Sequence, residues 1–138
     1  MSDGWKSVRL SEIEPVTVAG LQWLPPRKTL GVEAFGINAY VATAAGDHVL
    51  EEHTESHLGH QEVYFVTAGR ATFTLDGETL DAPAGTAVFI SNTEIRRGAI
   101  AEEPGTTVLA IGAKAGEAYA PSAWEWSFYA ERFRPSED

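Results

Sequence analysis

The feature that most constrains this fold is a series of short strand-like segments separated by turn residues. From Gly31 onward, short runs of apolar or alternating apolar and polar residues recur, with Gly, Pro and Asp between them. The clearest segments are 34–41, 63–67, 70–75, 78–80, 87–90, 95–100 and 106–111. Asp76-Gly77 is a hairpin signal between two of them. Strands at such regular spacing are typical of an all-β sandwich or barrel, which we predict here.

The two ends of the chain depart from this pattern. Residues 1–40 are predicted to form an N-terminal arm and the first strands, including a short strand at 16–18. Pro25-Pro26 predicts extended backbone before Arg27. We expect the arm to pack on the domain or on a second subunit. At the other end, capping residues and aromatics at helical spacing predict a helix over 121–133.

Length and composition predict one domain with an ordinary core. The chain has 138 residues, 43% of them hydrophobic, which suits a single domain over 1–138 with the barrel at 41–113. It contains no cysteine, which excludes disulfides and thiolate metal sites.

The negative net charge of the chain indicates which classes of binding partner are disfavoured. The net charge of −10 disfavours binding to nucleic acid or to anionic membrane surfaces. No apolar run approaches the roughly 20 residues of a membrane span. The first residues lack the order of a signal peptide, so we expect a cytoplasmic protein.

One segment is rich in metal-binding side chains. Three of the four histidines, His53, His57 and His60, lie within eight residues and alternate with carboxylates. A helix is disfavoured, because the order H-T-E-S-H differs from the metalloprotease order H-E-x-x-H. In a strand, His53 and His57 would share one face, and His60 and Glu62 would share another beyond the turn. The competing hypothesis is a solvated acidic loop.

The spacing of turn residues around this segment resembles the cupin superfamily. Its motifs run G-x5-H-x-H-x3,4-E-x6-G and G-x5-P-x-G-x2-H-x3-N. Six residues separate Glu62 from Gly69, as the first motif requires, and Gly77 precedes Pro83-Ala84-Gly85 and Asn92 as the second motif requires. The resemblance implies a double-stranded β-helix, or jelly-roll barrel, and also a homodimer.

The resemblance also implies a divalent metal, such as Zn, Fe, Mn or Ni, with His53, His57, His60 and Glu62 as candidate ligands. Two alignments are open: Glu55 and His57 as the H-x-H pair, or His53 and Glu55 as that pair with His60 beside Glu62. The second motif has Val88 at its histidine position. The place where other cupins carry this ligand later in the chain holds Arg96.

An arginine at that place changes the chemistry. A guanidinium has no lone pair for a metal and repels a cation by about 4 kcal/mol per unit charge at ~4 Å. Arg96 and Arg97 are neighbours in a strand, so one of them faces inward. The inward arginine would pair with Glu62 or bind an anionic group of a ligand; a solvated edge is the alternative.

Three function hypotheses follow. The first is a small-molecule-binding barrel without an obligatory metal, in which Glu62, Tyr64, Arg96, Phe73 and Tyr40 contact the ligand. The second is a metal-dependent cupin enzyme of the dioxygenase, isomerase or decarboxylase type, since three protein ligands are sufficient for catalysis. The third is a structural or regulatory protein whose barrel is filled by its core.

Overall fold

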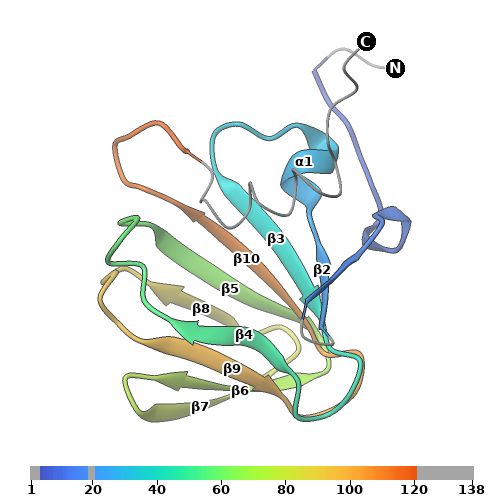
Figure 1. Cartoon of the computed structure of the whole chain (residues 1–138), viewed down its shortest axis with the longest axis vertical. Coiled ribbons are helices and arrows are strands. Elements are labelled where there is room, and N and C mark those ends of the chain that lie inside the picture. The colour runs from blue at the N-terminus through green and yellow to red at the C-terminus, as the bar shows by residue number, and fades with distance from the viewer. Residues whose placement is uncertain (1–3, 19–20, 121–138) are drawn as a thin grey trace.

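Two antiparallel sheets face each other in the computed structural model, which describes residues 4–18 and 21–120 (Figure 1). The larger sheet has six strands in the order β1-β2-β3-β10-β5-β8, and the smaller has four in the order β4-β9-β6-β7. The predicted helix over 121–133 lies outside the described residues.

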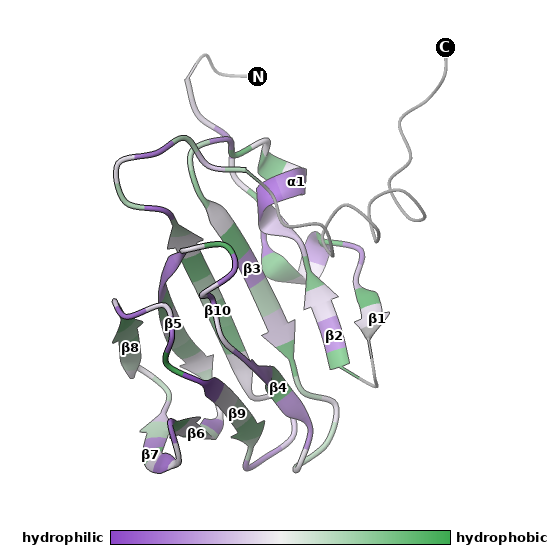
Figure 2. Ribbon diagram, turned by 60° about the vertical axis from the view of Figure 1, so that its left-hand side comes forward, coloured by the Kyte–Doolittle hydropathy of each residue, from purple (hydrophilic) through white to green (hydrophobic). Residues whose placement is uncertain are grey.

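The elements are short, as the sequence pattern predicts. In chain order they are η1 (Leu10–Glu12), β1 (Val16–Val18), β2 (Leu21–Leu24), α1 (Pro26–Leu30), β3 (Gly36–Val41), β4 (His48–His53), β5 (Gln61–Ala68), β6 (Arg70–Leu75), β7 (Glu78–Pro83), β8 (Ala87–Ile90), β9 (Arg97–Ala101) and β10 (Thr107–Ala113). In Figure 2, hydrophobic and hydrophilic residues alternate along β3. Such alternation is expected where one face of a strand packs inward.

The all-β, jelly-roll prediction is confirmed. Asp76 and Gly77 have positive φ values of 49° and 86° and form the tight turn that joins β6 to β7. Primed turns of this kind need positive φ at both positions, which Asp-Gly supplies. In the described part of the chain, the two sheets remain separate and do not close into one hydrogen-bonded barrel.

The N-terminal arm packs on its own domain. Its strand β2 pairs with β3, and Ile13 joins Leu24 and Ala39 in a small core cluster. The prediction of extended backbone at Pro25-Pro26 is wrong, because helix α1 begins at Pro26. Proline suits the first position of a helix, where its missing N–H would have no intrahelical partner.

The main core fills only part of the space between the sheets. Along β5 and β10, Val66 and Val108 are fully buried among apolar neighbours. Further along the same strands, toward Glu62 and Gly112, side chains line a cavity instead. Each of these strands therefore contributes to the core at one end and to the cavity at the other.

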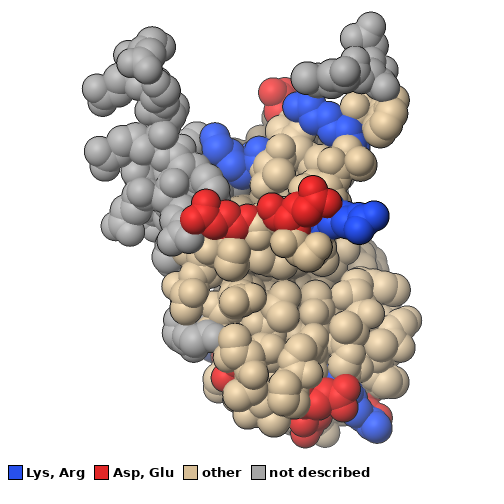
Figure 3. Space-filling model, turned by 90° about the vertical axis from the view of Figure 1, so that its right-hand side faces the viewer, with Lys and Arg blue, Asp and Glu red and all other residues tan. Residues whose placement is uncertain are grey.

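Charged side chains are unevenly distributed on the surface. Seen from the side of η1 and β2, acidic and basic groups lie in a band across the middle of the molecule, above that band and at the lower end (Figure 3). A broad area between the band and the lower end carries few groups of either kind. None of the helices within the described ranges has the length and apolar character needed to cross a membrane.

Candidate functional site

A cavity of about 630 Å³ lies between the sheets. Its volume is in the range of pockets that bind small organic molecules. Leu21, Trp23, Tyr40, Val49, Leu50 and Ala110 contribute apolar surface. The polar lining includes Asn38, His53, Glu55, His60, Glu62 and Tyr64.

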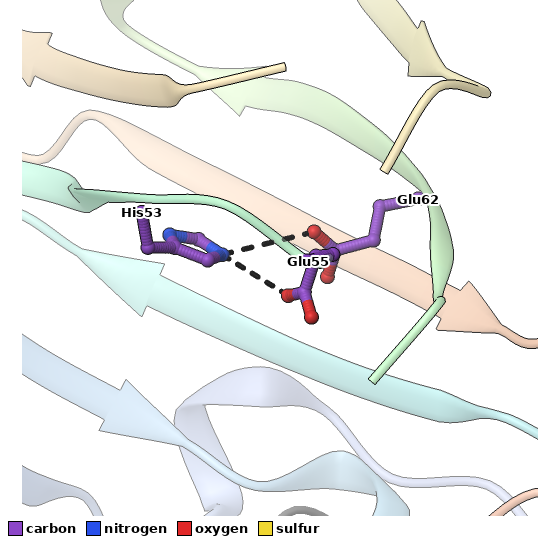
Figure 4. A group of neighbouring side chains, drawn as sticks. All are labelled: His53, Glu55 and Glu62. Carbon is purple, nitrogen blue, oxygen red and sulfur yellow. Dashed lines mark hydrogen bonds and ion pairs between the residues drawn. The ribbon is translucent and has the colours of Figure 1, made fainter. Parts of the chain in front are cut away.

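His53 ends β4 with its ring oriented by two contacts. Its Nδ1 lies 2.8 Å from the backbone oxygen of Glu51, which fixes the proton on Nδ1 and leaves Nε2 toward the cavity. Nε2 lies 3.1 Å from Oε1 of Glu55 and 3.9 Å from Oε1 of Glu62 (Figure 4). Burial alone would lower the pKa of His53, but its contacts with Glu55 and Glu51 outweigh burial and raise it.

Glu55 reaches the cavity because a turn follows it directly. The backbone N–H groups of Leu58 and Gly59 both donate to the carbonyl oxygen of Glu55, and Gly59 has a φ of 71°. Burial would raise the pKa of the Glu55 carboxyl, but the hydrogen bond with His53 outweighs burial and lowers it. The His53–Glu55 pair is thus stabilised in its charged form.

Glu62 is the most heavily contacted carboxylate of the site. Its Oε1 accepts hydrogen bonds from the Tyr64 hydroxyl and from Nη1 of Arg97, the latter at 3.1 Å. Burial and the neighbouring Glu55 charge raise the pKa of Glu62 to about 7, and the Tyr64 and Arg97 contacts limit that rise. Burial also raises the pKa of Tyr64, so its hydroxyl remains a donor at neutral pH.

Solved structures with a similar arrangement of strands identify the fold. KdgF from Halomonas matches with a TM-score of 0.65 and 17% identity over 83% of this chain and 93% of its own. An RmlC-like cupin from Shewanella frigidimarina matches with a TM-score of 0.63 and 16% identity over 89% and 96%. This chain has the cupin fold. Another match, Streptomyces Pac13, is described as a nucleoside dehydratase, with a TM-score of 0.59 and 15% identity over 87% of both chains.

Sequence comparisons add nothing to this cupin assignment: no family model matches the chain, and no curated protein matches it significantly.

The histidines of the cupin motif region separate in space. His53 and Glu62 meet at the cavity, while the turn after Glu55 carries His57 to an exposed position at its rim. His60 lines the cavity with its ring 5.5 Å from the ring of Tyr119. The structure groups His53 and Glu55 with Glu62, as in the alignment that has His53 and Glu55 as the first pair, but His60 is not part of this group among the described residues.

Arg97, rather than Arg96, faces the interior of the protein. The Arg97 side chain is fully buried, whereas Arg96 is 58% exposed and lies 3.8 Å from Glu52 on the outside. Motif spacing predicts Arg96 at the site, and this prediction is wrong. Arg97 shares its face of the strand with the buried Ala99 and Ala101, whereas Arg96 shares its face with Ile100, which is 41% exposed. Both motif alignments contain Glu55, although the predicted metal ligands omit it. Strand alternation predicts that one of the two arginines faces inward, and the structure places Arg97 there.

The remaining predicted ligand contacts divide between cavity and core. Tyr40 and Tyr64 line the cavity. Phe73 lies behind Tyr64 in the core, with the two ring centroids 6.0 Å apart. Phe73 therefore packs against Tyr64 and is not among the residues that line the cavity.

His53, Glu55 and Glu62 lie close enough to form a metal site, since their donor atoms are within 4.8 Å of one another. Two observations disagree with a divalent ion. Oε1 of Glu62 already accepts from Tyr64 and Arg97, and every buried side-chain polar atom in the described ranges has a hydrogen-bond partner. A dication about 4 Å from the guanidinium would be repelled by roughly 8 kcal/mol at an effective dielectric of about 20. The three side chains point toward one another, but they already form hydrogen bonds with other groups of the protein.

Proposed function

We propose that this protein binds a small organic molecule in the cavity between its sheets, without requiring a metal ion. The observation that carries the proposal is the cavity of about 630 Å³, whose polar end is formed by a charge-compensated group of side chains. His53 and Arg97 supply the positive charges, and Glu55 and Glu62 supply the negative charges.

The walls of the cavity suggest the character of the ligand. Apolar side chains such as Leu50 and Ala110 offer surface for a hydrocarbon or ring portion. Nε1 of Trp23 donates to Oδ1 of Asn38 at 2.8 Å, which orients the Asn38 amide at the wall. A ligand with an apolar body and one hydrogen-bonding end fits both surfaces. A protein of similar fold, Pac13, has been solved with uridine, so the fold accommodates an organic molecule of that size.

The proposal is tested by protein-observed NMR with a library of small polar fragments at millimolar concentration. We expect a subset of fragments to shift the amide signals of Glu62, Tyr64 and Ala110. Matched titrations use Ala110→Phe, which fills the cavity, and Leu80→Ala on the opposite sheet as the control. Shifts that survive in Ala110→Phe, or a library without any cavity binder, would contradict the proposal.

A metal-dependent cupin enzyme is the second candidate, and the convergence of His53, Glu55 and Glu62 is the observation that favours it. Metal analysis of protein purified without chelators separates the two candidates. About one ion of Zn, Fe, Mn or Ni per chain, lost in Glu62→Ala, would support the enzyme. Well under one ion per chain supports the organic-ligand proposal.

A further inference from the structure

We infer that the buried guanidinium of Arg97 supplies, beside Glu62, the positive charge that a metal ion would supply there. By doing so, Arg97 makes the pocket selective against divalent metals. This inference deepens the proposed function and rests on its metal-free form. It assigns to Arg97 a role in ligand selectivity, exerted through Glu62 and not by touching the ligand.

The position of the guanidinium is the first support. Nη1 of Arg97 lies 3.1 Å from Oε1 of Glu62, the same oxygen that lies 3.9 Å from Nε2 of His53. A metal ion bound by His53 and Glu62 would have to use or adjoin that oxygen. Arginine keeps its charge at all accessible pH values and cannot serve as a ligand itself.

The guanidinium is also held in place. Nε donates to the carbonyl oxygen of Ile95 at 3.1 Å, and Nη2 donates to that of Thr93 at 3.4 Å. The Thr93 carbonyl accepts in addition from the backbone N–H of Glu55. The side chain is fully buried and tied to the loop that contacts Glu55, so it cannot turn away to admit an ion.

The charge balance is the third support. As metal ligands, His53 would be neutral and Glu55 and Glu62 ionised, so these three side chains would carry a formal charge of −2. A divalent ion would balance that charge, and Arg97 would then add an uncompensated positive charge inside the protein, where charges are poorly screened. Without Arg97 the group with its ion would be neutral, and the oxygen of Glu62 that Arg97 contacts would be released for a ligand bond.

Isothermal titration with Zn²⁺ and spectroscopic titration with Co²⁺ test the inference on the full chain. The variant Arg97→Gln removes the charge, and Arg97→Lys keeps it as the matched control. We expect Arg97→Gln to bind one ion per chain at least 100-fold more tightly than wild type or Arg97→Lys. The gain should disappear in the double variant Arg97→Gln/His53→Ala, which locates the ion at the cluster.

Three results would overturn the inference. These are tight stoichiometric binding by the wild type, equal affinity of Arg97→Gln and wild type, or a gain in Arg97→Gln that His53→Ala leaves intact. None of these results depends on whether the cavity binds an organic molecule, which the fragment titration measures separately.

A measurement on the wild type covers the case in which the Arg97 variants do not fold. Paramagnetic Co²⁺ at millimolar concentration should leave the NMR signals of Tyr64 and Ala99 unbroadened if Arg97 excludes the ion. Selective broadening of those signals would show an ion at the cluster and would overturn the inference.

Discussion

Glu62 is a carboxyl group whose surroundings act on its charge in opposite directions. Burial and the Glu55 carboxylate disfavour its ionised form, whereas Tyr64, His53 and Arg97 favour that form. The balance moves its pKa from 4.5 to about 7. A group that titrates near neutral pH can both donate and accept a proton, so the Glu62 carboxyl is suited to proton transfer.

The raised pKa of Glu62 predicts a pH dependence of stability. The folded state holds this proton more tightly than the unfolded state does. Between pH 4.5 and about pH 7, Glu62 ionises in the unfolded chain but not yet in the folded protein, so the free energy of unfolding falls as the pH rises. Relative to Glu62→Gln, the wild type should therefore lose about 3 kcal/mol as pH rises across that window. Urea unfolding at several pH values measures the difference. Parallel curves for the two proteins would show that Glu62 titrates normally.

The hydrogen bond from Tyr64 to Glu62 should contribute to stability mainly when Glu62 is ionised. Tyr64→Phe removes the donor and should lower the free energy of unfolding by about 2 kcal/mol at pH 8, as for other hydrogen bonds to charged groups. In the Glu62→Gln background the same substitution should cost about half as much. A double-mutant cycle measures this coupling, and additive effects would contradict it.

At the scale of the elements, the turn between β5 and β6 depends on the absence of a side chain at Gly69. This residue has a φ of 74°, and a Cβ there would lie 2.7 Å from Cα and 2.4 Å from Oγ1 of Thr106. Thr106 is fully buried, and its hydroxyl donates to the carbonyl oxygen of Glu103 at 2.7 Å and lies 3.1 Å from that of Arg70. The turn at Gly69 and the start of β10 are therefore packed so closely that they leave no room for an added Cβ.

Gly69→Ala should lower the free energy of unfolding by about 2 to 4 kcal/mol, from strain at positive φ and from the collision with Thr106. The matched control is Gly85→Ala. Gly85 has a φ of 95° but open space around the added Cβ, so it should lose only the roughly 1 kcal/mol of backbone strain. Thermal or urea unfolding compares them. Equal losses would show that the contact with Thr106 relaxes at little cost.

At the scale of the whole molecule, the outer face of the larger sheet carries apolar side chains on neighbouring strands. Ile111 pairs with Val63, and Val63 pairs with Phe89 on the edge strand β8. Beside them, Phe65 pairs with Leu109. Phe89 is 62% exposed and Phe65 is 37% exposed within the described residues. An apolar sheet face next to an edge strand is a surface that commonly mediates association.

We predict that a second copy of the chain covers this face, which gives a homodimer in solution. Phe89→Asp should shift the mass measured by light scattering from dimer to monomer, because an ionised carboxylate would be buried at the interface. Leu80→Asp is the control, since Leu80 is an exposed apolar residue on the smaller sheet. A monomeric wild type, or equal dissociation of both variants, would contradict the prediction.

Local sequence determined only part of the strands and turns, since β4 is not among the predicted segments and the helix at Pro26 was not predicted. The β-branched and aromatic run at 63–67, the alternating residues at 70–75 and the Asp76-Gly77 turn specify their structures through side-chain preference, side-chain period and backbone φ, which depend on few neighbours. The inward orientation of Glu62 and Tyr64 follows from the same alternation. These features could be predicted without knowledge of distant contacts.

The tertiary structure alone decided which groups meet at the site. His53, Glu55, Glu62 and Arg97 come from three segments of the chain, and their distances depend on how β4, β5 and β9 pack across the cavity. Ile100 faces outward and Arg97 inward, although transfer free energies favour the opposite orientation. A buried guanidinium is stable only with a carboxylate and carbonyl oxygens around it, and those partners come together only when the sheets are assembled.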